Sequence, residues 1–229
     1  MEIMSNPIIL LAITFGIYYV ARQIQKWTGW IALNPILITI AALIALLQLT
    51  GISYETYEQG GQYIDFWLKP AIVALGVPLY QHLGHIRRQL LPILLSQLVG
   101  CLVGLVCVTL IASAMGASHE VIVSLAPKSV TTPIAMEVCR TAGGIPSLTA
   151  AIVVITGLIG AIIGFKTLSI GRVNNPMALG LSMGAASHAI GTSAAMERDQ
   201  FVGAYASLGL TLNGILTALL TPTVIELIG

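Results

Sequence analysis

Two short polar segments interrupt otherwise apolar sequence, and both hold side chains that could bind a charged solute. The candidate binding residues of the first segment, residues 126–133, are Lys128, Ser129, Thr131 and Thr132. Those of the second segment, residues 184–193, are Ser187, His188, Thr192 and Ser193. An ammonium attracts an anion, hydroxyls donate hydrogen bonds, and histidine titrates near neutral pH. The two segments together predict a solute-binding site, and the lysine favours an anion.

Both ionisable residues also have a purely structural interpretation. Lys128 could extend to the outer membrane interface and pair with a nearby acid, instead of facing a cavity. A lysine deep in a bilayer costs about 2.5–3.5 kcal/mol on insertion scales, so such a residue usually has a function. His188 could carry a proton or bind substrate, or it could simply be hydrogen-bonded in the core.

Two glutamates follow the polar segments at matching positions. Glu137 and Glu197, together with His188, are candidates for binding a coupling proton or cation. The favoured alternative is that the two glutamates pair with Arg140 and Arg198 at the rims of the polar segments.

The composition indicates a membrane protein. The chain has 229 residues, of which 56% are hydrophobic and 8% are charged, whereas about 25% are charged in an average soluble domain. The formal net charge of +1 argues against nucleic-acid binding. The three cysteines show no metal-ligand spacing and are expected to be small core residues. We expect neither a metal site nor a cofactor.

The apolar runs predict an all-α integral membrane protein with about six spanning helices. The expected spans are residues 7–20, 31–49, 64–80, 91–115, 147–166 and 201–226. Asn34-Pro35 is a typical start signal for the second of these helices. We expect one membrane domain over residues 1–229, with scaffold helices in residues 1–115 and the transport region in residues 116–229.

Two stretches, residues 121–144 and 175–200, are left over from the spans and contain the polar segments. Lys and Arg cluster after the first, third and fifth spans, which places those connections in the cytoplasm. Each leftover stretch would then enter the membrane and return, so the chain would form two re-entrant hairpins from opposite faces. Residues 132–137 also resemble residues 192–197, which predicts an inverted repeat unless the short similarity is accidental.

No convincing catalytic group appears, so we do not expect an enzyme. Residues 180–184 match the Gly-x-Ser-x-Gly pattern of hydrolases, but that pattern requires a strand before the serine in a soluble α/β sheet. Helix packing through small residues is the better explanation for these glycines in a membrane segment.

Several segments resemble signature stretches of the LrgB/CidB family. They are residues 125–136 (LAPKSVTTPIAM), residues 184–192 (GAASHAIGT), residues 69–80 (KPAIVALGVPLY) and the Asn34-Pro35 pair. The resemblance spans nearly the whole chain, and the first of these stretches is highly specific.

The resemblance implies two functions and a location in the bacterial inner membrane. Bacterial members are named antiholin-like proteins that modulate murein hydrolase export and autolysis, commonly with a small LrgA/CidA-type membrane partner. Plant members and some bacterial relatives move small monocarboxylates such as glycolate, glycerate or pyruvate. We favour a secondary carrier of such acids, with the regulatory membrane protein as the alternative. The low charge of the spans is also compatible with a homo-oligomer.

Overall fold

The computed structural model describes residues 6–28, 33–74, 76–81 and 83–228, and the regular secondary structure of these residues is helical. The chain divides into two compact units, Met1–Ala74 and Leu75–Gly229. The expected division between a scaffold and a transport region at residue 115 is a functional one and stays a prediction.

The first unit consists of α1 (Pro7–Thr28), α2 (Pro35–Thr50) and α3 (Tyr54–Ala74). The Asn34 side chain accepts hydrogen bonds from the backbone N–H groups of Ile36 and Leu37, and Pro35 occupies the first position of α2. This geometry confirms the start signal predicted from Asn34-Pro35. The hydroxyls of Thr14 and Tyr57 lie 3.1 Å apart and join α1 to α3.

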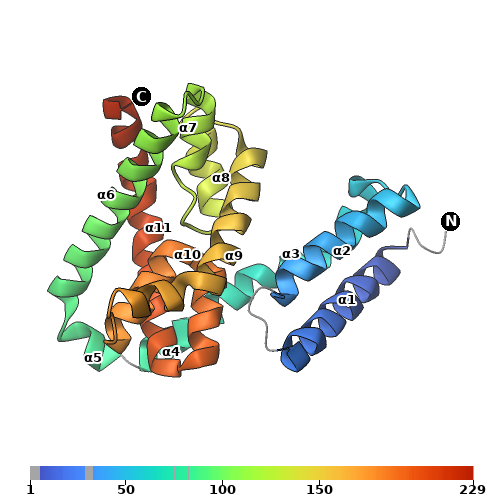
Figure 1. The fold of residues 1–229 in the computed structure, drawn as a ribbon, viewed down its shortest axis with the longest axis horizontal. Helices are drawn as coiled ribbons and strands as arrows, with labels where there is room; N and C mark the ends of the chain where they lie inside the picture. The colour runs from blue at the N-terminus through green and yellow to red at the C-terminus, as the bar shows by residue number, and fades with distance from the viewer. Residues whose placement is uncertain (1–5, 29–32, 75, 82, 229) are drawn as a thin grey trace. The chain divides into compact units, whose positions relative to one another are not determined.

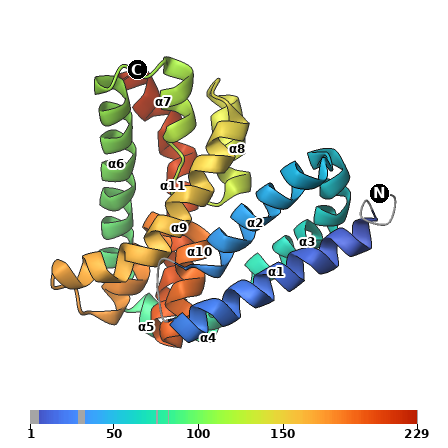
Figure 2. The ribbon, with the colours of Figure 1, turned by 45° about the vertical axis from the view of Figure 1, so that its right-hand side comes forward.

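The second unit contains the remaining helices, shown in Figures 1 and 2. They are α4 (Gly76–Gln81), α5 (Leu83–Arg87), α6 (Leu90–Ala114), α7 (His119–Leu125), α8 (Thr132–Thr141), α9 (Pro146–Ile170), α10 (Pro176–Arg198) and α11 (Gln200–Ile228). Helices α6 and α11 pack together, with α7 and α8 toward one end of the unit and α10 toward the other (Figures 1 and 2).

The protein is a multi-pass membrane protein. Within the described residues, α1, α6, α9 and α11 are long and apolar enough to cross a bilayer, with mean hydropathies from 1.5 to 2.5. Helix α2 is a shorter apolar helix. The span expected over residues 64–80 is divided between α3 and α4, with Leu75 outside the described residues. The total of six spans stays a prediction.

The first polar segment separates α7 from α8. Helix α7 ends at Leu125, and residues 126–129 form turns before α8 begins at Thr132. The chain then returns, because the Ser124 hydroxyl accepts a hydrogen bond from the Ile145 backbone N–H at 2.8 Å. The Thr149 hydroxyl donates to the Ser124 carbonyl at 2.9 Å. These bonds hold the start of α9 against the end of α7.

The second polar segment reverses the chain inside α10. Ser187 and His188 have non-helical backbone angles, and His188 has a φ of 42°. A Cβ built on Gly191 would lie 2.7 Å from the carbonyl oxygen of Met183. Eight residues of continuous helix span about 12 Å, so this approach shows that the chain folds back at the break.

The two similar hexapeptides both lie in a helical arm that follows a break. Residues 132–137 begin the helical arm after the first break, and residues 192–197 lie in the arm after the second. A long helix follows each arm, α9 in one case and α11 in the other. The inverted repeat itself stays a prediction.

Cysteine labelling tests whether α7 and α8 form a re-entrant hairpin. We expect both His119→Cys and Thr141→Cys to react with an impermeant maleimide outside intact cells, because both ends of such a hairpin lie on one side. The background would have Cys101, Cys107 and Cys139 replaced by alanine. If one position is labelled and the other is protected, α7 and α8 cross the membrane as a broken helix and do not form a re-entrant hairpin.

Candidate functional site

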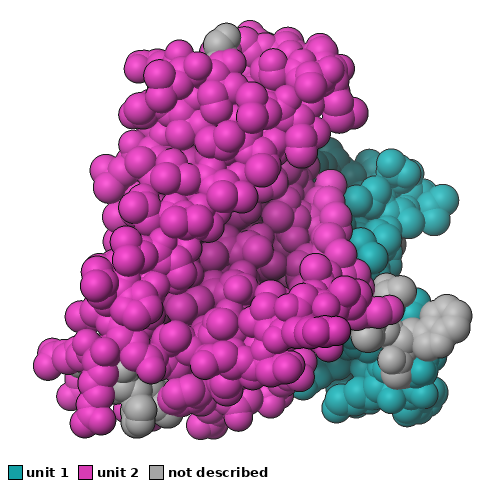
Figure 3. Space-filling model, turned by 60° about the vertical axis from the view of Figure 1, so that its left-hand side comes forward, with its two compact units in different colours: residues 1–74 teal, residues 75–229 magenta. Residues whose placement is uncertain are grey.

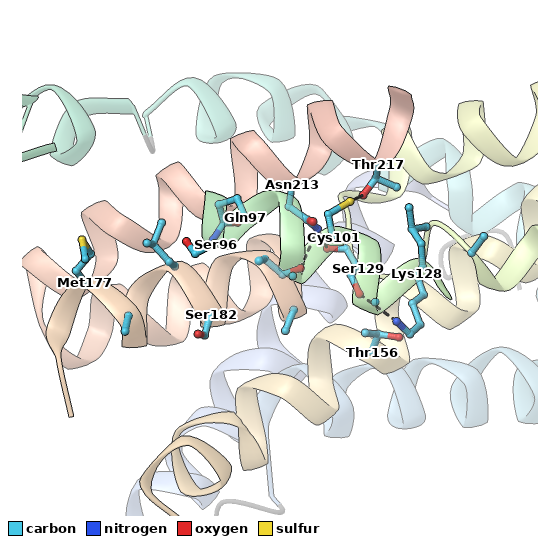
Figure 4. A pocket seen from close by; sticks show the side chains of 18 of the residues that line it. Ser96, Gln97, Cys101, Lys128, Ser129, Thr156, Met177, Ser182, Asn213 and Thr217 are labelled. Carbon is cyan, nitrogen blue, oxygen red and sulfur yellow. Dashed lines mark hydrogen bonds between the residues drawn. The ribbon is translucent and has the colours of Figure 1, made fainter. Parts of the chain in front are cut away.

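A cavity of about 560 Å³ lies in the second unit, between α6, the first break, α10 and α11. Its polar lining includes Gln97, Lys128, Ser129, Thr156 and Asn213 (Figure 4). The space-filling view shows that one face of this unit is hollowed (Figure 3). A cavity of 300–1,000 Å³ with a few polar groups is typical of small-molecule sites.

Lys128 carries the positive charge of this cavity. Its ammonium donates a hydrogen bond to the Ser129 hydroxyl at 3.3 Å (Figure 4). Within the part of the chain that the structure describes, no carboxylate oxygen lies within 4.0 Å of this ammonium. The pairing with a nearby acid, considered from the sequence, is therefore not found there. An unpaired cation in a partly buried cavity favours binding of an anion.

Asn213 on α11 connects the two breaks. Its side-chain nitrogen donates to the backbone carbonyl of Ala185 at 2.8 Å and to that of Ser129 at 3.4 Å. Figure 4 shows Asn213 beside Ser129. The side chain is 3% exposed, so these bonds satisfy a polar group that would otherwise be buried unpaired. One carboxamide thus holds the first break and the second break in a fixed relation.

Small residues let α10 pack closely on its neighbours. A Cβ on Gly184 would overlap the backbone carbonyl of Ala206 on α11. A Cβ on Gly157 of α9 would lie 2.5 Å from the His188 ring. The glycines of the Gly-x-Ser-x-Gly pattern therefore serve packing, and the pattern lies within helical α10 instead of following a strand.

His188 faces α9 and does not line the cavity. The residue is 4% exposed, and its Nε2 lies 2.8 Å from the carbonyl oxygen of Val153. The His188 carbonyl accepts a hydrogen bond from the Thr192 hydroxyl at 2.8 Å. These contacts support a role for His188 in anchoring the second break to α9. Proton coupling through His188 stays a prediction.

The other predicted residues are dispersed. Of the predicted binding residues, Lys128 and Ser129 line the cavity. Ser187 and Thr192 are buried outside it, Thr131 and Thr132 are half-buried near the start of α8, and Ser193 is exposed.

The two candidate coupling acids lie on the surface of the second unit. Glu137 is exposed and pairs with Arg140, as the structural interpretation predicted. Glu197 is also exposed, while the Arg198 guanidinium lies 4.5 Å from the centre of the Phe165 ring. A coupling role for either glutamate stays a prediction.

Asn213 and Gln97 line the cavity but were missed by the sequence reasoning. Both are carboxamides inside long apolar helices, α11 and α6. Their position inside apolar helices could have identified them from the sequence, because an uncharged polar side chain in a membrane span usually has a partner or a function.

The chain is similar to a known family and to several known proteins. The model of the LrgB-like family matches residues 14–227. The chain belongs to the LrgB-like family. It is 36% identical to the "Holin-like protein CidB" of Staphylococcus epidermidis RP62A over 222 residues, which cover 97% of each chain. Staphylococcus aureus Mu50 has a protein of the same name with the same identity and coverage.

Two further relatives carry no functional name. The "Uncharacterized protein YxaC" of Bacillus subtilis 168 is 36% identical over 220 residues, or 96% of each chain. An "Uncharacterized protein" of Haemophilus influenzae Rd is 39% identical, over 93% of this chain and 92% of its own. No solved structure matches the chain.

The variant His188→Gln separates anchoring from proton coupling. If His188 only ties the second break to α9, the variant should keep the wild-type dependence of carboxylate uptake on pH. It should also melt at a lower temperature, because the bond to the Val153 carbonyl is perturbed. Both properties can be measured on purified protein, in detergent and in liposomes. A flattened pH profile would instead assign a titrating role to His188.

Proposed function

We propose that this protein is a secondary carrier of a small monocarboxylate, such as glycolate, glycerate or pyruvate, and not an enzyme. The observation that carries the proposal is Lys128, a cation without a carboxylate partner among the described residues, in a cavity where the two breaks meet. An ion of opposite charge is the natural ligand of such a group.

Lys128 and Ser129 would hold the carboxylate. The ammonium supplies charge, and the hydroxyl beside it supplies a second hydrogen bond. Thr156 on α9 lines the same cavity and adds a further hydroxyl. The volume of about 560 Å³ leaves room for a small acid with some water.

Alternating access would come from movement of the two broken segments, together with α11, against the earlier helices, among them α6. Asn213 holds the carbonyls of Ser129 and Ala185, so the two breaks would move together while that contact lasts. Broken helices at the midplane are typical of secondary transporters. A coupling ion, if one is used, would bind at His188, Glu137 or Glu197.

The regulatory alternative rests on family membership. The Staphylococcus relatives are named holin-like. On this reading the chain would sit in the bacterial inner membrane and modulate murein hydrolase export with an LrgA/CidA-type partner. The cavity would then have no transported ligand.

Sealed liposomes containing only the purified protein distinguish the two readings. A carrier should give saturable uptake of labelled glycolate while a trapped fluorescent dye is retained. A holin-like protein should release the dye without selecting carboxylates, or should do nothing until the partner is added. Dye release without saturable uptake would therefore reject the carrier.

A further inference from the structure

Gln97 is a buried polar residue in the cavity with an unsatisfied atom. The residue lies on α6 and is 3% exposed. Its Oε1 has no hydrogen-bond partner among the residues that the structure describes. Exchanging the oxygen and nitrogen of the carboxamide would leave a polar atom at the same buried position. Buried carboxamide atoms are normally hydrogen-bonded, so this one requires an explanation.

The packing of α6 against α11 places Gln97 near the two breaks. The Tyr205 hydroxyl donates to Gln89 Oε1 at 3.5 Å, and the Cys101 thiol lies 3.4 Å from the Thr217 hydroxyl. Both pairs are separated by 116 residues, so α6 and α11 run side by side in one register. Gln97 and Asn213 have the same separation and therefore lie at the same level.

Gln97 and Asn213 then differ in what they bind. The Asn213 side chain is used by the protein, because its nitrogen holds the carbonyls of Ser129 and Ala185. Gln97 presents a carboxamide to the same cavity with its oxygen unsatisfied. Figure 4 shows Gln97 and Lys128 on opposite sides of Cys101 and Asn213. A ligand held by Lys128 could reach Gln97 with a second polar group.

We propose that Gln97 binds this second group and makes the cavity prefer acids that carry a hydroxyl over acids of similar size that lack one. The inference rests on the proposed carrier function. A hydroxyl can donate to the carboxamide oxygen and accept from the nitrogen, whereas a methyl group or a fluorine atom cannot donate. A site that leaves a buried acceptor unpaired discriminates against the ligand without the donor.

Uptake of labelled glycolate and acetate by Gln97→Met tests this role. Methionine keeps the length of the side chain and removes its hydrogen bonds. We expect wild-type protein to take up glycolate about tenfold better than acetate, as one hydrogen bond would give. In the variant this ratio should fall to about one, mainly through weaker glycolate uptake. A ratio unchanged by the substitution would overturn the proposal, as would an equal loss of both acids.

Thr109→Val is the matched control. Thr109 is buried on the same helix, and its hydroxyl donates to the Leu105 carbonyl of that helix. This variant should keep the wild-type ratio of glycolate to acetate uptake, and a loss of preference there would mean that any damage to α6 has the same effect.

A competition experiment on wild-type protein does not depend on the folding of any variant. Unlabelled fluoroacetate, which lacks the hydroxyl donor, should compete with labelled glycolate about tenfold more weakly than unlabelled glycolate. Equal competition by the two unlabelled acids would reject the proposal that the cavity recognises the hydroxyl, but it would not reject the proposed carrier function. Uptake of neither acid by wild-type protein would reject the carrier and the role of Gln97 together.

Discussion

Replacing Lys128 by methionine should lower glycolate uptake by about 100-fold, since a hydrogen bond to a charged group contributes up to about 3 kcal/mol. Methionine retains the apolar length of the lysine side chain and removes the charge, so membrane insertion should be unaffected. Uptake into liposomes and the melting temperature of the purified variant measure the two effects. The physical reason is that Lys128 has no carboxylate partner among the described residues and lines the cavity.

Two further substitutions control this result. Lys128→Arg keeps a cation with a different shape and should retain part of the uptake. Lys166→Met removes an exposed cation near the end of α9 and should retain nearly all of it. Normal uptake by a well-folded Lys128→Met protein would show that Lys128 does not bind the substrate. It would favour the interpretation in which the lysine extends to the membrane interface, and the proposed site would lose its basis.

Replacing Gly184 by alanine should destabilise the second unit by about 3 kcal/mol, or lower its melting temperature by roughly 10 °C. The added Cβ would overlap the backbone carbonyl of Ala206, which belongs to α11 and cannot move aside as a flexible side chain could. Helices α10 and α11 would have to separate. Uptake should fall as well, because Ala185 follows directly and accepts the hydrogen bond from Asn213.

Gly16→Ala is the control for this substitution. Gly16 lies in α1 of the first unit, and a Cβ there meets nothing within 4 Å. Alanine has the higher helix propensity, so this variant should melt at or slightly above the wild-type temperature. Equal melting temperatures for the wild type and Gly184→Ala would contradict the close packing of α10 on α11.

Local chemistry made part of the fold predictable. The N-cap at Asn34 and the breaks at residues 126–131 and 187–188 follow from short-range rules on caps, prolines and polar backbone in apolar sequence. The cation of the first break was predictable for the same reason. An ionisable residue in an apolar chain is costly to place in lipid and therefore usually faces a cavity or a partner. Lys128 does line a cavity.

Side-chain direction was not predictable, because it depends on contacts between distant segments. Nothing near His188 in the sequence indicates that its ring faces the Val153 carbonyl. The bond from Asn213 to Ala185 likewise joins residues far apart in the chain. Proximity along the chain predicts that the hydroxyls of each break lie together, whereas Ser187 and Thr192 lie outside the cavity.

Equilibrium binding of labelled glycolate to purified wild-type protein and Gly104→Leu tests the central claim most directly. Gly104 lines the cavity, and a Cβ there meets nothing within 4 Å. A leucine side chain can therefore occupy the cavity without pushing neighbouring residues aside. We predict saturable binding to the wild type, and loss of binding to the variant with no fall in melting temperature. Equal binding to both proteins would show that the carboxylate does not occupy this cavity.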